Sequence, residues 1–572
     1  MSIEAKRKAA VIGVITSGSL SEGLEMRLRP ECSVEQVRAG QFVVVHGREY
    51  HFFSMITDVR LDASSISILR DPPQSSLLTE VLAGDHTYAT ISLKPMLMVP
   101  RELPGEIDRE THLLPVKSIP AHFAQVYEAT QHDVNIVFGT EDKKSCSRYF
   151  CLGEPIDMEK VEVCLDLDRF IERSNGIFGK TGTGKTFLTR LVLAGLIRSN
   201  RAVNLIFDMH SEYGWQTRAE SGAGKDLFVK GLKNIFRSKV LIFTLDVDSS
   251  TARKVKYDYE VKIPLSAIEV EDIATLQDEL NLHSTAIETA YILVNRYKKN
   301  WLKTLLDFDP SQHVDEENGN PWKAWADELG ANRESLAALY RKLSQIRKLP
   351  FIIDKEEEKI DGVESRRASV DLIIRKLREG MNVDLEFGRV SNLLAYLLVA
   401  NLITRRIHQQ WVQDAEKYMA TQEIEHRPRP LMITIEEAHK FLNPTAARQT
   451  IFGTIARELR KYFVSLLVVD QRPSGIHDEI LSQLGTRITA LLNDEKDIQA
   501  VFTGVSGASA LRNVLASLDS KQQALVLGHA TPMPVVVKTR YYGPDFYRDM
   551  GMKEENERDH EIHSVVGAFP LG

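Results

Sequence analysis

The sequence predicts an α/β fold with a small β-barrel before it and a helical insertion within it. From about residue 160 onward, short apolar strands alternate with helical segments, and several strands end in acidic residues. Residues 1–100 contain short apolar runs separated by glycines and charged turns, which is typical of a small β-barrel. Residues 251–380 show helical periodicity and high charge instead, which indicates an insertion.

At 572 residues the chain is too long for one simple core. We expect the barrel and a connector in residues 1–150, and the first part of the α/β core in residues 151–250. The helical insertion then takes residues 251–380, the second part of the core residues 381–545, and a charged tail residues 546–572.

Individual elements follow from the apolar runs. We expect barrel strands at residues 11–15, 41–45, 50–56 and 87–91, and core strands at residues 202–208, 241–245, 431–435 and 464–470, with a late edge strand at 535–537. Residues 393–403 are apolar but end at two arginines. Because a membrane span needs about 20 apolar residues, we expect a buried core helix there and no membrane partner.

Composition narrows the function classes. The net charge of −7 argues against a generally basic nucleic-acid coat, although it leaves room for a local basic channel. The four cysteines form no C-x-x-C pair, and no signal peptide is evident at the N-terminus. These features favour a cytoplasmic protein.

The most informative run extends from Gly179 to Thr186 and fits G-x-x-x-x-G-K-[ST] at each fixed position. Glycines let backbone N–H groups turn around phosphate oxygens, while Lys185 supplies a charge and the Thr186 hydroxyl a ligand for Mg²⁺. A chance loop is disfavoured because an apolar strand precedes the run and a helix follows it. We therefore expect ATP and Mg²⁺ as cofactors, with the nucleotide bound by Gly179, Lys180, Thr181, Gly182, Thr183, Gly184, Lys185, Thr186 and Phe187.

A second set of candidate residues lies at the ends of later strands. The strand at 431–435 runs into Glu436, which we expect to hold Mg²⁺, and Glu437, which we expect to activate the attacking water. The alternative is a strand that runs into a polar turn. Gln471 follows the next strand and is placed to sense the γ-phosphate or position water.

Arginines on the intervening helix are candidates for a role across a subunit boundary. Arg457 and Arg460 could stabilise the charge that develops in phosphoryl transfer. The alternative, that they are ordinary surface arginines on a helix, stays open.

Taken together, these motifs resemble the HerA group of the HerA/FtsK ATPases. The resemblance rests on the phosphate-binding loop, the run from Asp208 to Tyr213, Glu436-Glu437-Ala438-His439, and the runs at residues 457–463, 471–474 and 527–530. It implies a RecA-like P-loop ATPase core, with Glu437 as base and Asp208 as a supporting acid near the metal or water. The family usually has Asp-Glu where this chain has Glu436-Glu437, which puts the rate of hydrolysis in question because Mg²⁺ demands near-ideal geometry.

The same resemblance implies an ATP hydrolase that forms a homo-hexamer and translocates duplex DNA through a central channel. It implies a separate partner, either a nuclease or an NAD-consuming effector, in DNA processing or antiviral defence. The alternative is an ATP-dependent ring scaffold that assembles and regulates the partner enzyme without processive translocation. A GTPase is disfavoured because no N-K-x-D run is present.

Overall fold

The computed structural model describes residues 10–552 except residues 72, 76, 79–81, 83–85, 103–108, 146, 157, 219–227, 311–320, 355–366, 369, 391, 450, 506–507 and 520. The predicted tail is thus described only as far as residue 552. The chain divides into two compact units. Unit 1 comprises Met1–Ser199, Val469–Ser474 and Leu481–Asp549, and unit 2 comprises Asn200–Val468, Gly475–Ile480 and Met550–Gly572.

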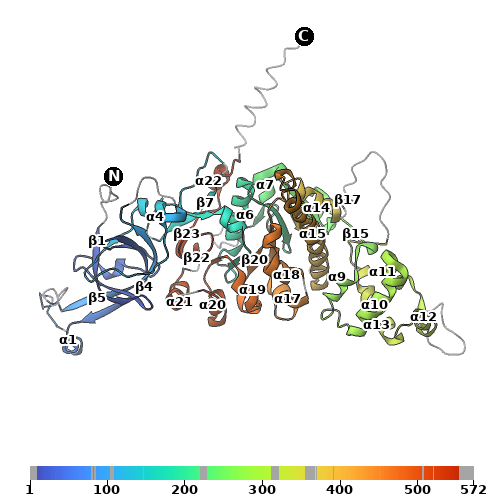
Figure 1. Cartoon of the computed structure of the whole chain (residues 1–572), viewed down its shortest axis with the longest axis horizontal. Coiled ribbons are helices and arrows are strands. Elements are labelled where there is room, and N and C mark those ends of the chain that lie inside the picture. The colour runs from blue at the N-terminus through green and yellow to red at the C-terminus, as the bar shows by residue number, and fades with distance from the viewer. Residues whose placement is uncertain are drawn as a thin grey trace, which may run out of the picture. The chain divides into compact units, whose positions relative to one another are not determined.

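Unit 1 begins with a closed barrel, as the sequence predicts (Figure 1). Around the barrel the strands are β1 (Val11–Ser19), β2 (Gly23–Leu28), β5 (Thr87–Pro100), β4 (Tyr50–Ala63), β3 (Phe42–His46) and β6 (Gln125–Glu128). Met26, Val43 and Ile91 are fully buried in its core. Closure leaves no open sheet edge, which removes a common route to aggregation. Strands β2 and β6 were not predicted from the sequence.

The remainder of unit 1 is an α/β layer that carries the glycine-rich loop. Its strands are adjacent in the order β9 (Asn175–Phe178), β21 (Thr486–Thr489), β22 (Gln523–Gly528), β23 (Val535–Thr539), β7 (Tyr149–Pro155) and β8 (Val163–Asp166). β9 and β21 are parallel, and the other pairs are antiparallel. The prediction of an edge strand at 535–537 is wrong, because β23 is hydrogen-bonded to β22 on one side and to β7 on the other.

Unit 2 is built on parallel strands, and its central strands are buried on both faces. Their order is β17 (Arg367–Ala368), β14 (Tyr259–Val261), β13 (Val240–Thr244), β18 (Asn382–Glu386), β10 (Val203–Asp208), β19 (Leu431–Glu436) and β20 (Val464–Asp470), whose last two residues belong to unit 1. Every residue of β10, β18 and β19 is buried. Parallel strands bring their carboxyl ends to one edge of a sheet, so the acids that terminate β10, β18 and β19 become neighbours.

The segment predicted as a helical insertion holds α9 (Val270–Ala274), α10 (Ser284–Tyr297), α11 (Trp301–Asp307), α12 (Trp322–Leu329) and α13 (Arg333–Arg347). Figure 1 shows α10 to α13 gathered in one group. Trp301 is buried and donates its indole N–H to the Ile268 carbonyl over 3.1 Å. The segment is not purely helical, since β14 and β17 join the parallel strands. The boundaries at 150, 250, 380 and 545 stay predictions.

The apolar run at 393–403 forms the first part of α15 (Leu393–Thr421). Asn392 caps its N-terminus by accepting a 2.8 Å hydrogen bond from the Leu394 N–H. The ring of Tyr396 packs edge-on against Phe387 and Phe441, with centroids 4.8 Å away in each case. The prediction of a buried core helix is therefore confirmed. Among the residues described, no helix has both the length and the apolarity that crossing a bilayer requires.

Candidate functional site

The glycine-rich loop of unit 1 connects β9 to α6 (Lys185–Ser199). Gly182 and Gly184 have φ values of 81° and 94°, which side-chain-bearing residues rarely adopt. A Cβ at either position would meet nothing within 4 Å, so the backbone conformation and not crowding requires glycine. Thr183 closes the turn by donating its hydroxyl to the Lys180 carbonyl over 2.7 Å. With Lys185 as the first helical residue, the loop presents the N-terminal end of a 15-residue helix.

Gln471 lies beside this loop although 290 residues separate it from its hydrogen-bond partner. The Thr181 hydroxyl donates to Gln471 Oε1 over 2.6 Å. The Gly179 N–H donates to the carbonyl of Asp470, the last residue of β20, over 3.3 Å. The end of β20 is thereby held against the loop, and the predicted phosphate-sensing amide is in hydrogen-bond contact with it.

The carboxyl end of β19 carries the two glutamates of unit 2. Glu436 is only 6% exposed, whereas the Glu437 side chain is 17% exposed. Glu437 has a φ of 48°, in the left-handed region that glutamate seldom occupies. Its carboxylate lies 3.8 Å from His439 Nδ1. Backbone strain of this kind often marks a residue whose side chain must be aimed at a particular point.

Two tyrosines and an aspartate hold the buried end of β19. Tyr213 donates its hydroxyl to Glu436 Oε1 over 2.6 Å, and Tyr396 donates to the Glu436 carbonyl over 3.2 Å. Asp208, at the end of β10, accepts the N–H groups of Glu212 and Tyr213, each over 2.9 Å. The predicted supporting acid is therefore linked to Glu436 through Tyr213.

Asp208 belongs to a group of buried acids that also includes Asp384 and Glu386 from β18. One carboxylate oxygen of each lies within 4.8 Å of the others. Burial, followed by the charge of Glu386, raises the pKa of Asp208 to about 7. Burial also raises the pKa of Asp384 well above its usual range, and raises the pKa of Glu386 although Arg253 opposes the rise. Such shifts are common where a fold holds carboxylates for a specific purpose.

Two known family models match this chain. Residues 150–407 match the family described as the central domain of helicase HerA, and residues 12–109 match the HAS barrel domain. The chain belongs to the HerA-type ATPases. It is an ATP-hydrolysing enzyme with an N-terminal barrel and a P-loop core, as the sequence predicts.

Relatives of this HerA-type ATPase cover nearly the whole chain. It is 19% identical over 561 residues to the DNA double-strand break repair helicase HerA of Pyrococcus furiosus, covering 92% of this chain and 91% of the relative. It is 23% identical over 544 residues to the protein of that name from Sulfurisphaera tokodaii, covering 92% of each.

Solved structures that align with part of this chain include VirB4 of Thermoanaerobacter pseudethanolicus and the bacterial conjugative coupling protein TrwB. VirB4 has a TM-score of 0.43 and 15% identity, covering 70% of this chain and 98% of VirB4. TrwB has a TM-score of 0.42 and 11% identity, covering 72% of this chain and 92% of TrwB.

The predicted arginines of the HerA-type core fall near the end of α18 (Ile451–Glu458) and in the 3-10 turn Leu459–Tyr462 that follows it. The side chains of Arg457 and Arg460 lie outside what the structure describes. Their predicted role therefore stays a prediction.

Sequence reasoning gave no role to four residues that surround the strand ends of unit 2, namely Asp384, Glu386, Tyr213 and Arg253. Of these, only Tyr213 lies in a run that carries the family resemblance. A partial signal for the two acids was present, because Asp384 and Glu386 are two apart in a strand where polar and apolar residues alternate. Positions two apart face the same side of a sheet, so the pattern predicts that the two carboxylates share one face, and the structure adds that this face is buried. No comparable local signal marks Arg253, whose guanidinium reaches Glu386 across 133 residues of sequence.

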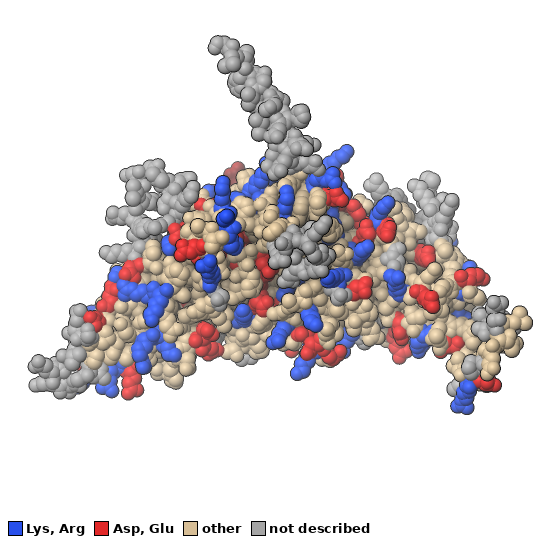
Figure 2. Space-filling model, turned by 180° about the vertical axis from the view of Figure 1, so that it is seen from behind, with Lys and Arg blue, Asp and Glu red and all other residues tan. Residues whose placement is uncertain are grey.

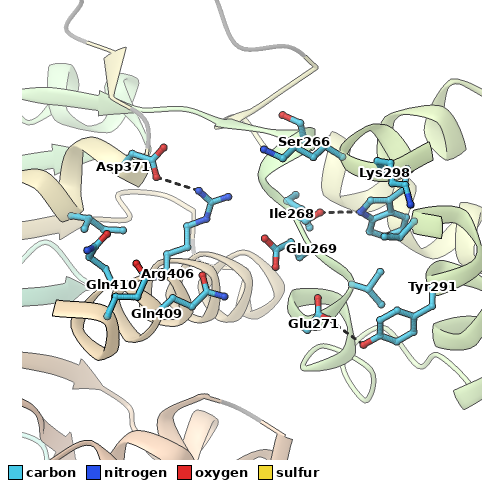
Figure 3. A pocket seen from close by; sticks show the side chains of 16 residues that line it. Ser266, Ile268, Glu269, Glu271, Tyr291, Lys298, Asp371, Arg406, Gln409 and Gln410 are labelled. Atoms are coloured by element: carbon cyan, nitrogen blue, oxygen red, sulfur yellow. Dashed lines mark hydrogen bonds and ion pairs between the residues drawn. The ribbon is translucent and has the colours of Figure 1, made fainter. Parts of the chain in front are cut away.

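A cavity of about 600 Å³ lies elsewhere in unit 2 (Figure 3). Residues of the helical segment, among them Glu271 and Lys298, form one side, and Arg406 and Gln410 of α15 form the other. Arg406 is paired with Asp371 over 3.2 Å. None of the predicted site residues lines this cavity.

Proposed function

We propose that this HerA-type ATPase is a hexameric, Mg²⁺-dependent motor that translocates duplex DNA and acts with a separate nuclease or NAD-consuming effector, in DNA processing or antiviral defence. The observation that carries the proposal is the glycine-rich loop in hydrogen-bond contact with Gln471. That contact gives the chain a nucleotide cradle together with a group that can respond to the γ-phosphate. The relatives named as DNA repair helicases supply the reason to propose DNA as the track.

Each proposed role follows from the chemistry of the side chain. Backbone N–H groups of the loop and Lys185 would bind the phosphates, and Thr186 and Glu436 would hold Mg²⁺. Bound Mg²⁺ would neutralise charge on the β- and γ-phosphates. Glu437 would accept a proton from the attacking water, because its carboxylate is partly exposed while Glu436 is buried. Asp208 supports Glu436 through Tyr213.

The residues present fit a magnesium ion. Glu436 Oε1 is engaged by Tyr213, which fixes the rotamer of the carboxylate. A glutamate at this position is one methylene longer than the aspartate usual in the family, and the tyrosine contact shows how the longer side chain is held in place. A fixed carboxylate meets the strict geometric demand of Mg²⁺ better than a mobile one.

The charge of the chain affects how it would bind DNA. The chain carries a net charge of −7, and basic and acidic side chains are interspersed on the face drawn in Figure 2. Binding to duplex DNA would therefore depend on a local basic surface, and it should weaken steeply with salt. If Arg457 or Arg460 acts on the nucleotide of a neighbouring subunit, turnover would depend on assembly of the ring.

The test is the steady-state ATPase rate of the purified chain with and without linear duplex DNA, at two salt concentrations. Lys185→Ala provides the blank, and Glu437→Gln should bind ATP but turn over at least about 100-fold more slowly. Strong stimulation by DNA supports the motor. An ATPase rate that does not change when DNA is added would favour a ring scaffold that regulates its partner. Normal hydrolysis by Lys185→Ala would refute the proposed nucleotide site.

A further inference from the structure

The carboxylates of Asp208, Asp384 and Glu386 form a compact cluster inside unit 2. All three residues are fully buried, and one oxygen from each lies within 4.8 Å of the others. On the adjacent parallel strands β10 and β18, Asp208 is paired in register with Glu386. Because Asp384 is two residues before Glu386, all three side chains share one face of the sheet.

Several oxygens of this cluster have no hydrogen-bond donor. Asp208 is satisfied by two backbone N–H groups, and Glu386 Oε2 accepts from Arg253. Both oxygens of Asp384 and Oε1 of Glu386 lack any hydrogen-bond partner although they are inaccessible to solvent. A buried carboxylate without a donor is costly, so a native fold normally supplies a partner for it. The unpartnered oxygens of Asp384 therefore indicate a ligand that the polypeptide itself does not provide.

The backbone of Gly214 lies close against two of these oxygens. A Cβ on Gly214 would lie 2.3 Å from Asp384 Oδ2 and 3.3 Å from Glu386 Oε1, so any side chain there would collide with the first and crowd the second. A Cβ there would also lie 2.8 Å from Ile242 Cδ1, so only glycine fits beside the unpartnered oxygens. The constraint is steric, because Gly214 is not among the glycines with positive φ.

Charge and spacing both match a hard divalent cation. Arg253 balances one of the three carboxylate charges, and an ion of charge +2 would balance the other two. Oxygens on opposite sides of an ion that binds them at about 2.4 Å are about 4.8 Å apart, within the range of Ca²⁺ and close to that of Mg²⁺ and Mn²⁺. A ligand set made only of oxygens disfavours Zn²⁺ and Cu²⁺.

We propose that Asp208, Asp384 and Glu386 bind one structural divalent cation of the Mg²⁺, Mn²⁺ or Ca²⁺ class, in addition to the Mg²⁺ that accompanies ATP. The cation fastens the ends of β10 and β18 together. It also steadies the backbone N–H groups of Glu212 and Tyr213 through Asp208. Since its ligands are all protein carboxylates, it binds without nucleotide.

The experiment measures Mn²⁺ bound to the nucleotide-free, full-length chain after refolding with Mn²⁺ and removal of loosely held ions. Elemental analysis and electron paramagnetic resonance count the bound ion and report its environment. We expect about one Mn²⁺ per chain, and a melting temperature that falls when a chelator removes it. Asp384→Asn should weaken binding at least about tenfold, since even changes in outer-shell partners cost that much.

Two variants separate this site from its surroundings. Lys185→Ala disables the nucleotide loop and should keep the ion, so failure of the proposed ATPase and failure of the cation site are distinguishable. Asp272→Asn changes another buried aspartate of unit 2 and should also keep it. If Asp384→Asn does not fold, Glu386→Gln replaces it. A wild-type chain that holds no Mn²⁺, or a cluster variant that holds it as tightly as wild type, would overturn the proposal in favour of carboxyl groups that share protons.

Discussion

Tyr213 donates a 2.6 Å hydrogen bond to Oε1 of Glu436, a residue that lies 223 positions later in the chain. Tyr213 is fully buried, and burial together with the charge of Glu436 raises the pKa of its phenol well above the usual value. The phenol therefore stays protonated across the pH range in which enzymes work, and it always donates. The bond fixes one oxygen of the carboxylate that we propose as a magnesium ligand.

Removal of this hydroxyl should slow turnover without weakening ATP binding. A hydrogen bond to a charged group contributes about 1.5–3 kcal/mol, so we expect Tyr213→Phe to lower kcat by about 10- to 100-fold. The matched control is Tyr396→Phe, which removes a hydroxyl that donates to the carbonyl of Glu436 and not to its carboxylate. Steady-state kinetics at several Mg²⁺ concentrations distinguish the two, and an equal loss of kcat in both variants would contradict the proposed role.

The contact between Thr181 and Gln471 predicts energetic coupling between the loop and the end of β20. Thr181→Val and Gln471→Ala should each lower kcat/KM, and the double variant should be little worse than the stronger single variant. A neutral hydrogen bond contributes about 1 kcal/mol, which sets the expected coupling energy. Thr183→Val serves as the control, because Thr183 donates to Lys180 and not to Gln471. Additive effects for Thr181 with Gln471 would exclude a functional link.

Much of the fold could be predicted from local pattern. The glycine-rich loop, the strand into Glu436 and the helix at 393–403 each carry a signal within a few residues of themselves. The barrel was predicted although β2 and β6 were missed. In β2 the buried Leu24, Met26 and Leu28 alternate with charged residues, and that alternation was available in the sequence.

The rest could not be predicted because it depends on contacts between distant segments. Strand order decides that residues 535–537 are central and not at an edge. Asp208 could be placed beside Asp384 and Glu386 only by knowing that β10 and β18 are neighbouring strands. These strands are far apart in the sequence: 178 positions separate Asn204 of β10 from its hydrogen-bond partner Asn382 of β18. The contacts around Glu436 could not be predicted either, because they too join segments that are far apart in the sequence.

Arg405 should stabilise unit 2 in a pH-dependent way. It donates two 2.9 Å hydrogen bonds to Asp272, one to each carboxylate oxygen. Burial raises the pKa of Asp272 even though Arg405 opposes the rise. In Arg405→Ala the folded-state pKa should rise further above the unfolded value of about 3.9. The folded variant then holds its proton more tightly than the unfolded chain, so its stability is greatest at low pH and declines as pH rises through the folded pKa.

The destabilisation caused by Arg405→Ala should therefore be small near about pH 4 and grow toward neutrality. Near pH 7 we expect about 3–5 kcal/mol, the usual cost of leaving a buried charge unpaired. Chemical denaturation across this range measures the effect. Arg406→Ala is the neighbouring control, because its partner Asp371 is 72% exposed and such pairs contribute about 0–1 kcal/mol. A loss that does not change with pH would rule out Asp272 as the cause.

The left-handed backbone at Glu437 predicts that the residue needed for turnover is not the one that gives the most stable fold. With φ at 48°, any residue with a Cβ is strained there, and glycine is not. Glu437→Gly should therefore be more stable than Glu437→Ala by about 1 kcal/mol, the reverse of the ordinary preference. Both variants lack the carboxylate and should lose turnover. Glu437→Gln keeps the strain and should match the stability of the wild type.

The adjacent position provides the control for this prediction. Ala438 is fully buried with a φ of −60°, so Ala438→Gly should destabilise the fold in the ordinary direction. Unfolding free energies from denaturant titration compare the four variants directly. If glycine is no better than alanine at 437, the strain is absent in solution. If Glu437→Gly is more stable than Glu437→Ala and inactive, the backbone strain at the end of β19 lowers the stability of the wild type while it holds the Glu437 carboxylate in place.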